Sequence, residues 1–293
     1  MEDPFYAMSF ENLNQTRLML TSLETIGRNK LPNVIFRNHR AILKTKEITL
    51  QTWAFHPIIT VEEKEILLLV FQKFVRACEN LKVTFFLYGG ALLGSFRHHD
   101  MIPWDDDIDV FVPAEKKNLL QRALVPLNLS GFSLYHPLDK PWKFYWSKPK
   151  TLLHKPFRWP YIDIFFYEDN GTHIFDQQRE YRFFAYRKID VFPLTVRPFA
   201  GAFLPAPCNT DAVLRKNYSP NLCSSPRFSH KTETMPHKTQ HLTIPCKRLH
   251  NVYPFVFRRW QESGNSVTEE VKIGGATFHS VQLNVHCDQR HRV

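Results

Sequence analysis

The first clear periodic pattern of hydrophobic residues begins after Thr60. Its apolar positions, spaced to fall on one side of a helix, are Ile66, Val70, Phe74 and Ala77. Thr60 and Glu63 have the spacing of a capping box, in which each side chain accepts from the backbone N–H group of the other residue. The pattern therefore predicts a helix that begins after Thr60 and ends near Asn80.

Short β-branched or aromatic runs then alternate with amphipathic stretches. Strands are expected at 83–88, 108–112, 131–135, 143–146 and 161–167. Helices are expected at 91–96 and 114–124, and residues 97–100 are expected to form a polar loop. This alternation indicates an α+β (α/β-like) fold with a sheet flanked by helices.

Both ends of the chain differ from this central part. Residues 1–58 form a mixed lead-in, with a short helix expected at 18–23 and irregular or short-stranded structure from residue 33 to 60. After about Asn221, Ser, His, Lys, Thr and Pro dominate as far as residue 250, which predicts a loop or linker. Residues 271–285 are expected to form a hairpin around Gly274 and Gly275.

The composition favours a folded protein with anionic partners. The chain has 293 residues, 43% of them hydrophobic and 25 of them Phe, which excludes a wholly disordered protein. The formal net charge of +10 favours nucleotides, sugar phosphates, nucleic acid or anionic membranes, although a solvated basic surface explains it equally well. No segment has the length of a membrane span, and Glu2 and Asp3 stand where a signal peptide would be basic.

The five cysteines indicate neither a metal site nor a definite disulfide pairing. None are spaced as C-x-x-C, so no zinc finger is expected, and their odd number predicts no disulfide framework. Cys208 and Cys223 could pair in an oxidising compartment, which the sequence leaves open.

Gly89 and Gly90 interrupt the chain between a predicted strand and a predicted helix. Glycine allows the backbone to approach a phosphate closely, and a helix N-terminus offers free N–H groups to an anion. The motif lacks the Lys-Ser/Thr of a P-loop and the spacing of a dinucleotide fingerprint. Taken alone, it is better explained as an ordinary tight turn.

An acidic run follows, with aspartates at 105, 106, 107 and 109. Four carboxylates in five positions repel one another unless water or a cation neutralises them. Asp107 and Asp109 are two residues apart on a predicted strand and therefore face the same side. Two such carboxylates suit one or two Mg²⁺ ions with room for phosphate oxygens, and the alternative is an acidic turn before a strand.

A calcium-binding EF-hand loop has a similar alternation of acids. Asp105, Asp107 and Asp109 fit its spacing, but its sixth position would be Val110 instead of Gly and its twelfth Lys116 instead of Glu. A strand fits this segment better.

Asp163 is a lone acid in the apolar run at 161–167. Burying a charge there is costly without a partner. If its strand lies beside that of Asp107 and Asp109, it completes a site of three carboxylates. The alternative is an ion pair with Arg158 or Lys188.

Residues 88–113, which read YGGALLGSFRHHDMIPWDDDIDVFVP, resemble the LicD family, which includes the phosphorylcholine transferases, fukutin and the fukutin-related proteins. A weaker similarity continues through YIDIFFYE and on to Tyr218, so the resemblance covers about residues 61–222. The glycine turn is Gly-Gly here, where Gly-Thr is frequent in the family. The sequence after Tyr218 does not continue in the family's form, which leaves acceptor binding open.

The resemblance implies a nucleotidyltransferase-type mixed β-sheet flanked by helices, with a less ordered basic C-terminal extension. The implied division is a lead-in at 1–58, the LicD-like catalytic domain at 59–222, and a basic linker with a possible hairpin tail at 223–293. The implied activity is transfer of a phospho-alcohol, such as phosphocholine or ribitol phosphate, from a CDP-linked donor to a glycan or glycoprotein acceptor.

The resemblance also implies roles for individual residues. Asp107 and Asp109 would hold Mg²⁺ or Mn²⁺, and Asp163 would be the third carboxylate, which assists the metal or accepts the proton of the sugar hydroxyl. The turn formed by Gly89 and Gly90 would contact the donor phosphates. Arg97 would stabilise charge on the transferred phosphate, since guanidinium matches phosphate oxygens.

Two other functions stay open. One is a non-catalytic family member that binds sugars or nucleotides. The other is a nucleotidyltransferase acting on RNA, although no basic and aromatic pattern of an RNA-binding module is visible and nucleic acid is not the expected partner. The family includes members of the Golgi and secretory pathway, which are fukutin-like, and cytoplasmic bacterial members, and the sequence does not choose between these compartments.

Overall fold

We describe the chain from a computed structural model. The residues it describes are 53–149, 152, 154–178, 180–181, 183–236, 241–262, 266–284 and 287. The helix expected at 18–23 lies outside them, as does the lead-in as far as residue 52.

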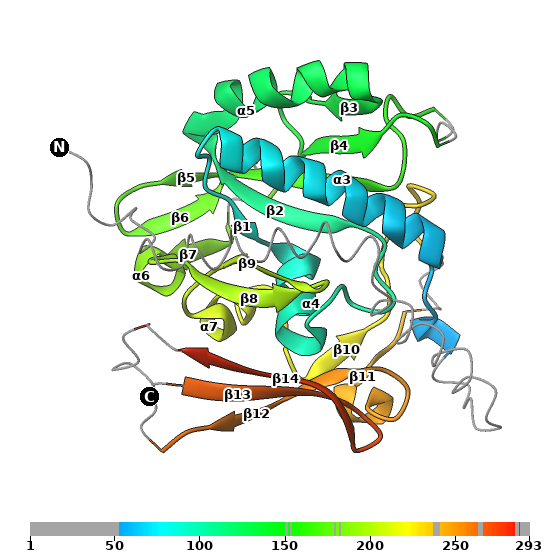
Figure 1. Cartoon of the computed structure of the whole chain (residues 1–293), viewed down its shortest axis with the longest axis vertical. Coiled ribbons are helices and arrows are strands. Elements are labelled where there is room, and N and C mark those ends of the chain that lie inside the picture. Colours follow the sequence, from blue (N-terminus) through cyan, green and yellow to red (C-terminus); the bar gives the residue numbers. More distant parts are fainter. Residues whose placement is uncertain are drawn as a thin grey trace.

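A mixed seven-stranded sheet forms the centre of the molecule (Figure 1). Its strands are β1 (Phe86–Leu87), β2 (Ile108–Pro113), β3 (Phe132–Tyr135), β4 (Trp142–Trp146), β5 (Tyr161–Asp169), β6 (His173–Asp176) and β7 (Ala185–Arg187). The main order is β1-β2-β5-β4-β3, and β6 joins β5 to β7. The pair β2–β5 is parallel and the other pairs are antiparallel.

The expected α+β fold is confirmed, with one strand shorter than expected. The strand predicted at 83–88 is reduced to Phe86–Leu87. At its start, the N–H group of Val83 donates to the carbonyl of Cys78 at 2.8 Å, just after Lys82, which adopts φ 53°. The N–H group of Val83 is therefore unavailable for pairing with β2.

Helices cover both faces of the sheet. In Figure 1, α3 (Val61–Asn80) and α5 (Lys117–Leu124) lie together on one side, and α4 (Gly89–His98) lies on the other side, toward the C-terminal strands. The capping box of Thr60 and Glu63 is confirmed. The helix expected at 114–124 begins as a 3-10 turn, η3 (Ala114–Lys116), and continues as α5.

The prediction of a polar loop at 97–100 is wrong at its start. Arg97 and His98 form the last turn of α4, and both are buried. The helix stops at His99, which adopts a left-handed conformation with φ 55°. Polarity suggested a loop, but packing against later segments holds these side chains inside.

The structure describes further helices and strands outside this sheet. They are η2 (Trp53–Phe55), η4 (Val125–Ser130), α6 (Lys188–Val191), β8 (Thr195–Phe199), β9 (Ala202–Ala206), α7 (Thr210–Leu214), β10 (Leu222–Ser224), β11 (Thr243–Pro245), η6 (Cys246–Leu249), β12 (Phe255–Trp260), β13 (Ser266–Ile273) and β14 (Ala276–Asn284). The hairpin predicted around Gly274 and Gly275 is confirmed as β13–β14. Within the described residues, no helix has the length and apolar character needed to span a membrane.

The loop or linker predicted after Asn221 differs from the structure. The described residues there include the β10–β11 hairpin and η6, and a disulfide joins Cys223 to Cys246 with 5.0 Å between their Cα atoms. Cys208 pairs with Cys287, so the suggested bridge between Cys208 and Cys223 is wrong. Tertiary contacts between distant segments decide these pairings, and spacing along the sequence does not reveal them.

A buried ionic cluster attaches the β12–β14 sheet to the rest of the molecule. Glu269 of β13 is 0% exposed and accepts hydrogen bonds from Arg197 of β8 at 2.8 Å and from Arg258 of β12 at 2.7 Å. His99 lies 2.7 Å from the same carboxylate. Burial alone would raise the pKa of Glu269, but Arg197, His99 and Arg258 outweigh it and hold that pKa well below its ordinary value.

We predict that Glu269→Ala destabilises the protein by about 3–5 kcal/mol, because the buried guanidinium of Arg197 and the partly buried guanidinium of Arg258 lose their common counter-charge. Urea unfolding at neutral pH measures this. Glu270→Ala is the matched control on the same strand, where the carboxylate pairs near the surface with Lys272 and Arg259 and is expected to contribute little to stability. Equal losses in the two variants would show that the cluster does not hold the sheet.

Candidate functional site

Three predicted carboxylates meet where β2 and β5 run side by side. Asp109 is the register partner of Asp163 across the parallel pair, and Asp107 immediately precedes β2. Each of the three offers one oxygen, and these oxygens all lie within 4.8 Å of one another. Asp107 and Asp163 are buried, and Asp109 is half-buried.

Asp163 is paired with a lysine that the sequence did not single out. Lys143 of β4 lies opposite Asp163 in register and places its Nζ atom 2.8 and 3.0 Å from the two carboxylate oxygens. The suggested ion pairs with Arg158 and Lys188 are wrong, because Arg158 donates to the carbonyl of Pro149 and Lys188 pairs with Asp169. A lysine inside the aromatic run WKFYW was the available signal.

Burial and neighbouring carboxylates raise the pKa values of Asp105, Asp107 and Asp109. Burial raises the pKa of Asp109 to about 7, and the charges of Asp163 and Asp105 add to this effect. Burial also raises the pKa of Asp105 to about 6, with a contribution from Asp106. Burial raises the pKa of Asp107 well above its ordinary value, and it exceeds the opposing effect of His230, while the charges of Asp109 and Asp105 add to the rise. Such a group favours a cation among its oxygens.

The two glycines bring the start of α4 against these carboxylates. The N–H group of Gly90 donates to Oδ2 of Asp109 at 2.9 Å. A Cβ atom on Gly89, whose φ is +49°, would lie 2.3 Å from the same oxygen, and one on Gly90 would lie 2.5 Å from Oδ2 of Asp105. The close approach to carboxylates therefore accounts for both glycines, and their contact with donor phosphates stays a prediction.

Arg97 lies outside the group of three carboxylates. Its Nη1 atom donates to the carbonyl of Leu222 at 3.1 Å and contacts the Sγ atoms of Cys223 and Cys246, each at 3.4 Å. Burial lowers the pKa of Arg97 to about 10, partly opposed by Asp105. The guanidinium thus binds the β10–β11 hairpin in this structure, and its role toward phosphate stays a prediction.

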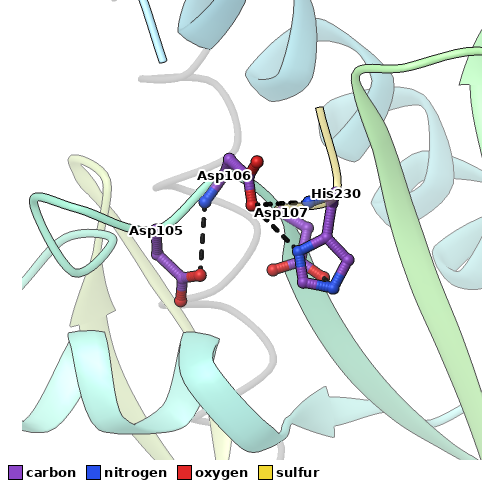
Figure 2. Close-up of side chains that lie close together, drawn as sticks. All are labelled: Asp105, Asp106, Asp107 and His230. Atoms are coloured by element: carbon purple, nitrogen blue, oxygen red, sulfur yellow. Dashed lines mark hydrogen bonds and ion pairs between the residues drawn. The ribbon is translucent and has the colours of Figure 1, made fainter. Parts of the chain in front are cut away.

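His230 joins the acidic group from a distant part of the chain. Figure 2 shows its ring beside Asp106 and Asp107, with Nδ1 2.9 Å from Oδ1 of Asp106. Its Nε2 atom lies 3.2 Å from Oδ2 of Asp107. Burial alone would lower the pKa of His230, but Asp107 and Asp106 outweigh it and raise that pKa to about 11. No sequence pattern singled out this residue, because the surrounding composition indicated a linker.

The donor set fits a hard divalent cation. Asp107, Asp109 and Asp163 supply clustered carboxylate oxygens, the ligands that Mg²⁺ and Mn²⁺ prefer. The EF-hand alternative is wrong, since Asp109 and Val110 lie inside β2 and pair with β5.

Comparison with known proteins supports a class for this fold. Residues 82–209 match the family described as LicD/FKTN/FKRP, nucleotidyltransferase domain, and this match supports the LicD family for the chain.

Individual relatives agree with this family. The chain is 42% identical over 55 residues to the lipopolysaccharide cholinephosphotransferase LicD of Haemophilus influenzae, a match that covers 18% of this chain and 21% of the relative. It is 27% identical over 161 residues to the human ribitol 5-phosphate transferase FKRP, covering 53% of this chain and 31% of the relative. The mouse protein of the same name is 29% identical over 163 residues, with the same coverage. The matches span less than a third of the length of these relatives.

We predict that Gly89→Ala destabilises the protein through two effects. Alanine is strained in the left-handed backbone conformation, which costs about 1–2 kcal/mol. Overlap of its Cβ atom with Asp109 costs about 1–3 kcal/mol more. Gly274→Ala is the control for the first effect, because Gly274 has a matching φ of +53° and its added Cβ would meet no atom closer than 3.8 Å. Chemical denaturation of both variants measures the difference. If Gly274→Ala lost as much stability as Gly89→Ala, the close contact with Asp109 would have no energetic weight.

Proposed function

We propose that this protein is a metal-dependent phosphotransferase that moves a phospho-alcohol, of the phosphocholine or polyol-phosphate type, from a CDP-linked donor to a glycan acceptor. The observation that carries the proposal is the convergence of Asp107, Asp109 and Asp163 at the parallel β2–β5 pair. The names of the relatives support the reaction class, since one is a cholinephosphotransferase and the other a ribitol 5-phosphate transferase.

In this proposal Asp107, Asp109 and Asp163 hold Mg²⁺ or Mn²⁺, which supplies neutralisation of the charge that develops on the transferred phosphate. Asp109 is fixed by the N–H group of Gly90, and Asp163 is fixed by Lys143. Both carboxylates are therefore held in place before any substrate arrives. Such preorganisation is what favours the transition state over the ground state.

Asp163 has a second role in the proposed reaction. Its carboxylate is buried and oriented by a single ammonium group, that of Lys143, which touches both of its oxygens. A carboxylate in this position can accept the proton of a sugar hydroxyl as that oxygen attacks phosphorus in line with the leaving CMP.

The donor would lie against the start of α4. Unpaired N–H groups at a helix N-terminus and the positive end of the helix dipole favour phosphate oxygens. The N–H of Gly90 is already engaged by Asp109, so donor binding at this turn uses the N–H groups of neighbouring residues or replaces this bond.

We predict that Asp109→Asn lowers metal-dependent transfer by about 100-fold or more, the loss typical when a charge-stabilising group at the reacting centre is removed. Release of CMP from CDP-choline and CDP-ribitol, with Mg²⁺ or Mn²⁺ and with EDTA, measures it. Asp169→Asn is the matched control, because Asp169 ends the same strand as Asp163 but pairs with Lys188.

Full activity of folded Asp109→Asn would refute the assignment. Wild-type protein that binds these donors without releasing CMP in the presence of any acceptor sugar would favour a non-catalytic binding protein instead.

A further inference from the structure

The turn at residues 229–234, here called the site turn, is built onto the acidic site. Ser229 and Thr234 exchange backbone hydrogen bonds of 2.9 and 3.2 Å, which closes the turn. Two of its side chains contact the catalytic domain beside the site. Lys231 lies 2.7 Å from the carboxylate of Glu63, and Glu233 accepts from the hydroxyl of Tyr161.

Asp106 is the anchor of this turn. Its Oδ1 accepts from the N–H group of His230 at 3.3 Å and lies 2.9 Å from the Nδ1 atom of the same residue. Its Oδ2 accepts from the N–H group of Lys231 at 2.8 Å and from the hydroxyl of Ser229 at 3.4 Å. Both oxygens of Asp106 therefore bind the site turn, whereas the proposed metal ligands are Asp107, Asp109 and Asp163.

We propose that His230 is a positioning residue, which holds Asp107 through Nε2 while Asp106 holds its Nδ1 atom (Figure 2). The inference rests on the proposed function, since it concerns the metal-binding orientation of Asp107. Carboxylates that bind metals are commonly oriented by a hydrogen bond to a residue behind them, and loss of that residue typically weakens metal binding about 10–100-fold. His230 stands in a comparable relation to Asp107, through an ion-pair contact of 3.2 Å between Nε2 and Oδ2.

Contacts of the segment that precedes the site turn also help to fix the position of His230. The site turn follows β10, which the disulfide between Cys223 and Cys246 joins to the start of η6. Arg97 contacts both sulfur atoms, and the indole N–H of Trp104 donates to the carbonyl of Ser224 at 2.9 Å. The LicD domain and the segment after residue 222 thus form one site, in which the later segment supplies the group that orients Asp107.

Two conservative variants separate the ring's two contacts. His230→Gln places an amide N–H near the position of Nε2 and keeps a donor for Asp107, whereas His230→Asn places it near Nδ1 and keeps the contact with Asp106 only. Lys231→Met is the control for docking of the turn, because it removes the ion pair with Glu63 but keeps the backbone N–H bond to Asp106.

Mn²⁺ alone is the probe, with its dissociation constant measured by electron paramagnetic resonance on the full chain. We expect His230→Asn to bind Mn²⁺ about 10–100-fold more weakly than wild type, and His230→Gln and Lys231→Met to bind within about 3-fold of wild type. Circular dichroism melting shows that each variant is folded at the temperature of the measurement.

Three outcomes would overturn the inference. Equal weakening in His230→Asn and Lys231→Met would show that docking of the turn matters and the ring contact does not. Unchanged or tighter binding in both histidine variants would show that His230 acts only through its charge or not at all. Wild-type protein that binds no Mn²⁺ would refute the metal dependence of the proposed function together with this inference, whereas the first two outcomes leave that function standing.

Discussion

Mutual repulsion among carboxylates is the constraint on which the arrangement of this molecule depends. Asp107, Asp109 and Asp163 have oxygens within 4.8 Å of one another, and at an effective dielectric of about 20 each ionised pair at that separation costs about 3–4 kcal/mol. Three positive or hydrogen-bonding groups reduce this cost. They are the ammonium of Lys143, the ring of His230 and the N–H group of Gly90. They come from β4, the site turn and the start of α4, so the site exists only when these three segments are assembled.

The same constraint explains which parts of the site could be predicted from the sequence. Asp107 and Asp109 are close in sequence, and the two-residue period of a strand placed them on one face. Asp163 could be proposed because an acid inside an apolar strand needs a partner. Lys143 and His230 could not be assigned, since their positions depend on strand register and on a contact across more than a hundred residues. Composition after Asn221 even indicated a linker, because polar residues that bind a buried acidic site resemble solvated ones.

The fold shows a similar division between local and long-range information. The capping box at Thr60, strands β2 to β5 and the β13–β14 hairpin follow from spacing and turn residues, and the structure confirms them. The buried end of α4 and the disulfides depend on segments far along the chain. Arg97 and His98 have the polarity of a loop, yet the β10–β11 hairpin and Pro254 provide partners that keep them inside.

The glycine turn illustrates how one motif can satisfy two different requirements. A strand followed by Gly-Gly and a helix can bind phosphate, and the resemblance to the LicD family implied that role here. In the structure, the carboxylates of Asp109 and Asp105 leave no space for a side chain at Gly89 and Gly90. The N–H group of Gly90 also donates a hydrogen bond to Asp109. A helix N-terminus stabilises a carboxylate for the same electrostatic reason that it stabilises a phosphate. The turn therefore holds the acidic group in place first, and any donor phosphate must bind beside an aspartate that the same helix already orients.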